Sequence, residues 1–224
     1  MTGTSPPGSR LLSSPEWVYL LREFDASYRY GSAGGSKAIR SHRRKVRERI
    51  SDVYESNAPV VDRAPATLPV VAHLPRALEL GSRGALAPLS RTLDRVKHHL
   101  TWEYGYEKVP RHLAERYAYC EILGPQGPVI CDDLILGLVL FAPRTTYPAH
   151  HHAGIEESYV SVAGAWSEND LAVYAPGSLV LNRDAHEHRI TTGDHDPSLL
   201  AYAWVGDPDR LANPGMSFSA RRRA

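Results

Sequence analysis

The feature that most constrains the fold is a series of short β-type segments in the second half of the chain. From residue 117 to residue 205, runs of β-branched, aromatic and aliphatic residues are separated by turns rich in glycine and proline. Many short strands joined by tight turns are typical of an antiparallel sandwich or barrel, and the jelly roll is one such fold. The expected strands are residues 117–123, 129–131, 134–142, 157–163, 171–174, 178–182, 188–192 and 199–205.

The first half of the chain has a helical pattern instead. Apolar residues recur at helical spacing over residues 15–28, and three glycines follow, so we expect a helix that ends there. Two further helices are expected over residues 36–54 and 86–100. Residues 57–75 contain four prolines and are expected to form an extended connector.

The change of pattern near residue 110 predicts how the chain is organised. We expect a helical region over residues 1–110 that packs on a β-barrel over residues 111–210. Residues 211–224 are expected to form a C-terminal tail, whose last arginines are interpreted as a solvated, disordered end.

The charge of the chain argues against a nucleic-acid or membrane partner. The 224 residues carry a formal net charge of +1, with 42% hydrophobic and 23% charged residues, which is typical of a soluble globular protein. Residues 37–49 are crowded with lysine and arginine but lack interleaved aromatic residues. We therefore expect this helix to present a solvated face, or one that meets an acidic partner surface.

No segment of the sequence suggests export or insertion into a membrane. The longest apolar run, residues 134–142, is about half as long as a membrane-spanning helix must be. No signal peptide opens the chain. The only cysteines, Cys120 and Cys131, are interpreted as reduced thiols in a cytoplasmic protein, although a disulfide across a hairpin is the alternative.

The residues that predict chemistry lie between Tyr147 and Tyr159. Side chains alternate between the two faces of a strand, so His150 and His152 point the same way. The same alternation places Glu157 and Tyr159 together on one face of the next strand. Two imidazoles and a carboxylate that converge from neighbouring strands are three ligands of a divalent metal ion, and the fourth is expected from a distant strand.

This pattern resembles the two conserved motifs of the cupin superfamily. The first motif, G(X)5HXH(X)3-4E(X)6G, matches His150-x-His152, four residues, Glu157, six residues and Gly164. In the second motif, G(X)5PXG(X)2H(X)3N, counting from Gly177 places the histidine at His188 rather than at His186.

The match to the cupin motifs is incomplete at four positions. Arg144 stands where the first motif opens with glycine, and Arg183, Ala185 and Thr192 replace the proline, glycine and asparagine of the second. The resemblance implies a mainly β cupin fold, the double-stranded β-helix or jelly-roll barrel, with a helical region before it. It also implies one divalent metal ion bound by His150, His152, Glu157 and His188.

A narrower resemblance, over about residues 100–207, is to the cupin-type dimethylsulfoniopropionate (DMSP) lyases. It is carried by Tyr147-Pro-Ala-His-x-His, Glu-Glu-x-Tyr159, Ala-Pro-Gly-Ser-Leu-Val, His188-x-x-Thr-Thr-Gly-Asp and Tyr202-Ala-Trp204-Val-Gly-Asp. The helical half resembles the longer, DddL-type members in arrangement. This similarity implies a carbon–sulfur lyase that converts DMSP, a small-molecule substrate, into acrylate and dimethyl sulfide.

The elimination requires a base, a Lewis acid and a place for the sulfonium group. A tyrosine close to a metal cation is a suitable base because the cation lowers its pKa. Tyr159 is the first candidate base, and Tyr147 is the second or orients the substrate carboxylate. Tyr202 and Trp204 share one strand face and are expected either to hold the sulfonium by cation–π attraction or to pack in the core.

The nature of the metal and the exact activity stay open at this point. Three histidines and one glutamate suit Fe(II), Mn(II), Zn(II), Ni(II) or Co(II). The alternatives to a lyase are another cupin metalloenzyme, such as a dioxygenase, and a non-enzymatic small-molecule-binding cupin. A homodimer is also left open.

Overall fold

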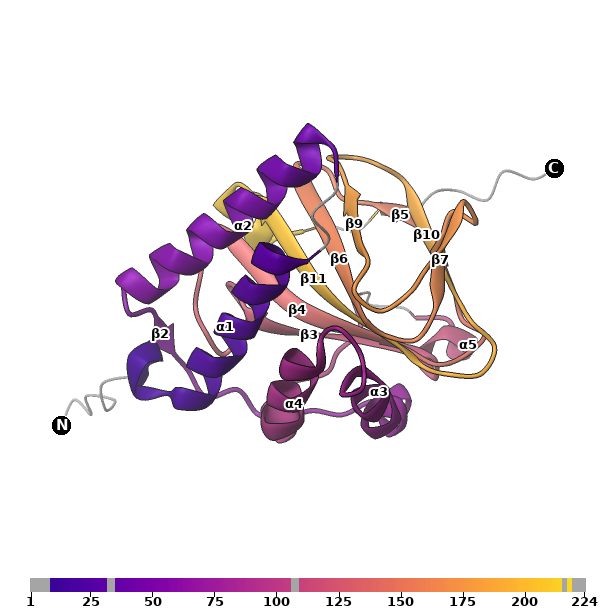
Figure 1. The fold of residues 1–224 in the computed structure, drawn as a ribbon, viewed down its shortest axis with the longest axis horizontal. Coiled ribbons are helices and arrows are strands. Elements are labelled where there is room, and N and C mark those ends of the chain that lie inside the picture. Colours follow the sequence, from indigo (N-terminus) through magenta and orange to yellow (C-terminus); the bar gives the residue numbers. More distant parts are fainter. Residues whose placement is uncertain (1–8, 32–34, 106–108, 215–216, 219–224) are drawn as a thin grey trace.

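The computed structural model describes residues 9–31, 35–105, 109–214 and 217–218. The expectation for the terminal arginines, Arg221–Arg223, lies outside the described residues. The chain forms two antiparallel sheets of five strands, with the N-terminal helices on one side (Figure 1).

The strand order of each sheet is not the order of the sequence. The first sheet has the order β3-β4-β11-β6-β9 and the second has the order β12-β5-β10-β7-β8. The strands of the first sheet are β3 (Tyr117–Leu123), β4 (Leu134–Phe141), β6 (Ile155–Ala163), β9 (Leu179–Asn182) and β11 (Ser198–Gly206). Those of the second are β5 (Thr146–His151), β7 (Trp166–Glu168), β8 (Ala172–Tyr174), β10 (His188–Thr192) and β12 (Ser217–Phe218). This arrangement confirms the mainly β cupin barrel.

The helices before the barrel cover the outer face of the first sheet (Figure 1). They are α1 (Pro15–Tyr30), α2 (Lys37–Glu55), α3 (Leu74–Gly81) and α4 (Ala87–Val96), with short 3-10 turns at Leu11–Ser13, Pro69–His73 and Lys97–His99. The small elements are β1 (Ser9–Arg10), β2 (Pro59–Val60), α5 (Arg111–Ala114) and α6 (Pro208–Ala212). No helix of the described residues is both long and apolar enough to cross a membrane.

Strand β4 lies between two hydrophobic cores. All eight of its residues are buried, which explains the long apolar run in the sequence. Leu136, Leu138 and Leu140 face the helices and belong to the core beneath them. Ile135 and Phe141 face the other way, into the barrel interior. Both faces of this strand are therefore buried. The division into residues 1–110, 111–210 and 211–224 stays a prediction.

The basic helix α2 makes many of its contacts within the chain. Lys45 pairs with Glu156 at 3.0 Å, and Arg49 pairs with Asp133 at 3.0 Å. Arg43 donates to the carbonyl oxygen of Tyr28 at 2.7 Å. Much of the positive charge of this helix therefore stabilises its position against α1 and the barrel.

The expected extended connector over residues 57–75 is wrong in its second half. Pro69 begins a 3-10 turn and Pro75 lies in the first turn of α3. At the start of a helix a proline loses no hydrogen bond, because its missing N–H would have no partner there. The prolines at these positions therefore mark helix starts rather than extended chain.

The expected strand over residues 129–131 and the disulfide alternative have different outcomes. Val129 forms only isolated bridges with Val60 and Leu123, because the surrounding turn interrupts the ladder, so the strand prediction is wrong. Cys120 and Cys131 are both free and buried, as predicted for reduced thiols. The short strand β7 was not predicted.

Candidate active site

Four side chains that the sequence predicted as ligands meet in the barrel interior. His150 lies on β5, His152 directly follows that strand, Glu157 lies on β6, and His188 begins β10. Their ligand atoms all lie within 4.8 Å of one another, and all four residues are buried. The cluster therefore joins side chains from both sheets.

The strand register explains why distant segments meet here. His188 and His150 are direct partners in the antiparallel pair of β10 and β5, so their side chains share one face. His151 does not belong to the cluster and is only partly buried, which agrees with the predicted alternation. The side chain of His186, the alternative to His188, is exposed and does not belong to the cluster.

At two positions where the chain departs from the cupin motifs, the backbone has the conformation that the motif glycine would adopt. Arg144 has a φ angle of 56° and Ala185 has a φ angle of 55°, both in the left-handed region that glycine normally occupies. The backbone N–H of Ala185 donates to the carbonyl oxygen of His152 at 3.0 Å. The turn before His188 thus fixes the end of β5, although the motif glycine is absent.

Backbone carbonyls orient two of the imidazoles. Nδ1 of His150 lies 3.0 Å from the carbonyl oxygen of Pro148, and Nδ1 of His188 lies 3.1 Å from that of His186. When Nδ1 carries the proton for these bonds, Nε2 has its lone pair available. Nε2 of His188 lies 3.0 Å from Oε2 of Glu157. The free lone pairs are therefore available to a common ligand.

The centre of the cluster contains polar atoms that need a partner. Among the described residues, Nε2 of His152, Nε2 of His188 and Oε2 of Glu157 have no hydrogen-bond partner although they are buried. Buried polar atoms without partners are rare in folded proteins and often mark a bound ion. Three imidazoles and one carboxylate fit a divalent transition metal, so the site's chemistry agrees with a metal at this position.

The electrostatics of the cluster suit a metal. Burial lowers the pKa of His150 to about 3, which keeps this imidazole neutral. Burial acts to raise the pKa of Glu157, but the neighbouring imidazoles, His188 first, hold it well below its usual range. Burial acts to lower the pKa of His188, but the Glu157 carboxylate raises it, so the cluster favours a positive charge beside Glu157. A metal cation would supply that charge and leave neutral imidazoles and an ionised carboxylate as ligands.

Trp204 supports the cluster from the side. It is the cross-strand partner of Glu157 on β11. Its indole Nε1 donates a 2.6 Å hydrogen bond to Oε1 of Glu157, and its ring centroid lies 4.5 Å from that of His152. Trp204, expected as a substrate wall, therefore also holds a predicted metal ligand in place.

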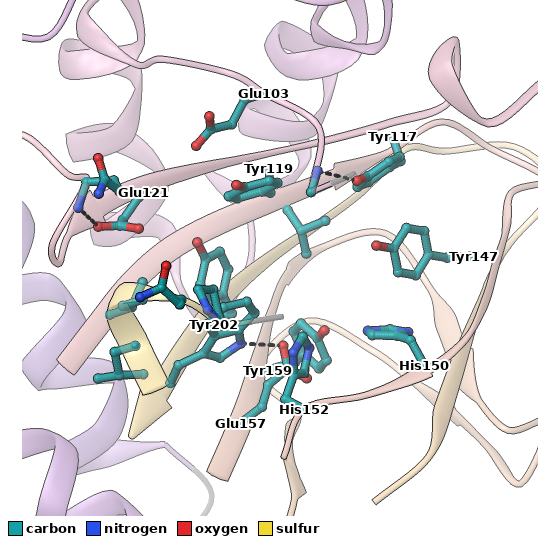
Figure 2. Close-up of a pocket in the computed structure, with 18 of the residues that line it drawn as sticks. Glu103, Tyr117, Tyr119, Glu121, Tyr147, His150, His152, Glu157, Tyr159 and Tyr202 are labelled. Carbon is teal, nitrogen blue, oxygen red and sulfur yellow. Dashed lines mark hydrogen bonds and ion pairs between the residues drawn. The ribbon is translucent and has the colours of Figure 1, made fainter. Parts of the chain in front are cut away.

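The cluster opens into a cavity of about 440 Å³ (Figure 2). The tyrosines predicted as candidate bases, Tyr159 and Tyr147, both line it and are buried. The ring centroid of Tyr159 lies 6.0 Å from that of His188, and the ring of Tyr147 lies 4.9 Å from that of His150. Tyr202 lines the same cavity, with its ring centroid 5.4 Å from that of Trp204.

Sequence reasoning missed a group of cavity residues on and beside β3. Tyr117, Tyr119 and Glu121 point into the cavity from alternate positions of this strand, and Glu103 reaches it from the preceding segment (Figure 2). The alternation over residues 117–123 places the first three on one face of the strand, but it does not show that this face lines a cavity.

Known proteins that are similar to this chain agree with this geometry. A family model for dimethylsulfoniopropionate lyases matches residues 42–200. A protein of Cereibacter sphaeroides, provisionally named dimethylsulfoniopropionate lyase DddL, is 63% identical over 215 residues, which cover 96% of this chain and 93% of that protein. The chain belongs to the DMSP lyase family. It is thus an enzyme of the carbon–sulfur lyase class.

Solved structures of DMSP lyases show the same fold. The structure of DddQ from Ruegeria pomeroyi matches 94% of this chain and 100% of its own, with a TM-score of 0.70 and 19% identity. A chain from the crystal structures of the DMSP lyases RdDddP and RnDddQII matches 92% of this chain and 98% of its own, with a TM-score of 0.65 and 20% identity. The helical region is included in both matches, since each covers more than nine tenths of this chain.

Proposed function

We propose that this chain cleaves DMSP by a metal-dependent β-elimination, with a tyrosine as base. The observation that carries the proposal is a buried three-histidine, one-glutamate cluster that opens into a cavity next to two buried tyrosines. Membership of the DMSP lyase family supports the same reaction.

The base tyrosine, as its phenolate, takes a proton from the carbon next to the substrate carboxylate and becomes a neutral phenol. The electron pair of that C–H bond forms the double bond of acrylate, and the C–S bond breaks with its electrons on sulfur. Dimethyl sulfide leaves as a neutral molecule and needs no general acid. His150, His152, Glu157 and His188 would hold a divalent metal ion, which would supply a Lewis acid for the negative charge that develops on the carboxylate.

Tyr159 is the proposed base. It follows Glu157 by two residues on β6, so its ring faces the same interior as the cluster. Tyr147 lies on the other sheet, beside His150, and is the second candidate or orients the carboxylate. Both side chains are buried, so their rings are shielded from bulk water.

Tyr202 and Trp204 are proposed to receive the sulfonium group. Both lie on β11 and line the cavity, with their rings next to each other. An aromatic face attracts a cation with about 0.5–2 kcal/mol and places no charge near the cluster that competes for the metal.

The native metal is proposed to be one of Fe(II), Mn(II), Zn(II), Ni(II) and Co(II), because this donor set suits each of them. The test is to incubate the purified protein with DMSP and each metal, and to measure acrylate in solution and dimethyl sulfide in the headspace. We expect both products in equal amounts, and we expect a chelator to abolish them and added metal to restore them.

A matched pair of histidine variants sharpens this test. His188→Ala removes one proposed ligand, and His98→Ala removes an exposed imidazole far from the cluster in the sequence. We expect activity to be lost only in the first. Metal-loaded protein that forms no product would contradict the proposal, and oxygen consumption with Fe(II) would favour a dioxygenase.

A further inference from the structure

The cavity has a second end that the elimination mechanism does not use. Glu103 and Glu121 line it, and in Figure 2 they lie on the far side of Tyr119 and Tyr202 from His150. Among the described residues that line the cavity, none is a lysine or an arginine. A cavity with carboxylates at one end and no basic residue favours a cation at that end.

The register of the first sheet places Glu121 in line with the proposed base. Glu121 pairs with Gly137 on β4, Gly137 pairs with Tyr202 on β11, and Tyr202 pairs with Tyr159 on β6. Directly paired residues point to the same face of a sheet. One row across the barrel wall therefore runs from a carboxylate, through an aromatic ring, to the metal-side tyrosine.

Gly137 allows this row to form. A Cβ atom at this position would lie 2.5 Å from the hydroxyl oxygen of Tyr202, so the ring of Tyr202 lies where a side chain would otherwise stand. The same hydroxyl lies 3.4 Å from the carbonyl oxygen of Cys120, on β3. The ring of Tyr202 thus reaches from β11 toward the strand that carries Glu121.

Backbone hydrogen bonds position both acidic residues. Oε1 of Glu121 accepts a 2.7 Å hydrogen bond from the backbone N–H of Gln126, which orients the carboxylate beside the turn after β3. Glu103 and Tyr119 exchange two backbone hydrogen bonds, of 2.9 and 3.1 Å, so their side chains share the cavity face. Glu103 is exposed at the edge of the cavity, and Glu121 is partly buried.

We propose that Glu121, assisted by Glu103, forms a cation-selecting subsite that orients a zwitterionic substrate. The inference rests on the proposed function, because it assumes a substrate with a carboxylate at one end and an onium group at the other. The carboxylates attract the onium end and repel the substrate's carboxylate, which is therefore directed toward the histidines. Tyr119 and Tyr202 lie between the two ends and supply the aromatic surface.

The test compares two ligands of equal shape and different charge. 3-(Trimethylammonio)propionate carries a cation where 4,4-dimethylpentanoate carries a neutral tert-butyl group, and both keep the carboxylate. Their dissociation constants are measured by calorimetry with metal-loaded protein, so turnover is not the readout. We expect the wild type to prefer the cationic ligand, and Glu121→Gln to lower that preference about tenfold.

Further variants separate charge from folding. We expect Glu121→Asp to keep most of the preference, because it keeps the charge, and Glu103→Gln to lower it about threefold, because an exposed charge is screened. Glu48→Gln removes an exposed carboxylate on α2 that is paired with Arg44, and we expect no change in preference. An affinity for 4,4-dimethylpentanoate that is at least as high as in the wild type shows that each variant keeps a folded site.

The outcomes for the subsite and for the lyase activity are distinct. Glu121→Gln protein with the wild-type preference overturns the subsite, even if DMSP is cleaved. A preference that is lost in Glu121→Gln supports the subsite, even if the same protein forms no dimethyl sulfide and the proposed reaction fails.

Discussion

Trp204 donates a 2.6 Å hydrogen bond from its indole nitrogen to Oε1 of Glu157, its cross-strand partner. This bond leaves Oε2 of Glu157 to face His188 at 3.0 Å. The aromatic wall of the cavity and the proposed metal cluster are thus connected through one side chain, and a change in the wall is expected to affect the metal.

Trp204→Phe is the first test of that connection. The substitution keeps an aromatic ring but removes the N–H donor, so Glu157 loses the partner that orients it. We expect the affinity for the metal to fall about 10–100-fold, as measured by competition with a chromogenic chelator. Trp17→Phe, on α1, is the matched control and is expected to keep the wild-type affinity. Equal affinity in Trp204→Phe and in the wild type would show that the bond does not support the site.

The roles of the two candidate bases differ in kinetics. Tyr159→Phe is expected to lower kcat by at least about 100-fold with little change in KM, because a base acts in the transition state. Tyr147→Phe is expected mainly to raise KM, because an orienting residue acts on bound substrate. Steady-state rates of acrylate formation measure both. The opposite pattern would exchange the roles, and unchanged kcat in both variants would refute a tyrosine base.

The proposed subsite predicts a pH dependence of ligand selection. Burial raises the pKa of Glu121 to about 7, the charge of Glu103 adds to this, and Arg63 opposes it. Glu121 is therefore neutral below this pH and negative above it, and burial also raises the pKa values of the facing Tyr119 and Tyr202, so these phenols stay neutral.

The preference for 3-(trimethylammonio)propionate over 4,4-dimethylpentanoate should therefore increase as the pH rises through about 7. Because both ligands carry the same carboxylate, titration of the histidine cluster cancels in the ratio of their dissociation constants. We expect Glu121→Gln to remove the pH dependence. A ratio that is constant between about pH 5.5 and about pH 8.5 in the wild type would contradict the assignment.

The ligand cluster could be predicted from the sequence because it depends on local rules. Strand alternation selected His150 and His152 over His151, and the motif spacing selected His188 over His186. Both rules work without knowledge of the fold around them. Both rules gave the correct histidines even though Ala185 replaces a motif glycine, because the backbone keeps the left-handed conformation that the glycine would adopt.

The acidic end of the cavity could not be predicted in the same way. Both faces of β3 are covered, one by helices and one by the barrel interior. Alternation places Cys120 and Glu121 on opposite faces, but it does not tell which of the two faces lines a cavity. Glu103 reaches the cavity through a bridge to Tyr119, and this pairing depends on tertiary structure rather than on a strand pattern around Glu103. Long-range register therefore decides this part of the site.

A buried hydrogen-bond network behind β6 is expected to stabilise the barrel. Oγ of Ser158 lies 2.8 Å from Nε2 of His42 on α2 and 2.7 Å from the hydroxyl oxygen of Tyr28 on α1. All three side chains are buried. His42→Phe removes the imidazole that contacts Ser158 and Glu156, while the hydrogen bond between Ser158 and Tyr28 remains, and we expect it to lower the free energy of unfolding by about 1–3 kcal/mol in urea titrations.

A double-mutant cycle separates this network from simple packing. Ser158→Ala combined with His42→Phe is expected to cost less than the sum of the two single changes, because each single change already removes the hydrogen bond between these two residues. Additive losses would show that the two residues act independently.

Anomalous diffraction from crystals of the metal-loaded protein, measured at the absorption edge of the metal, tests the central claim most directly. We predict a single strong peak within bonding distance of Nε2 of His150, His152 and His188 and of the Glu157 carboxylate. A peak at another position, or no peak in crystals of protein that carries one metal ion per chain, would contradict it.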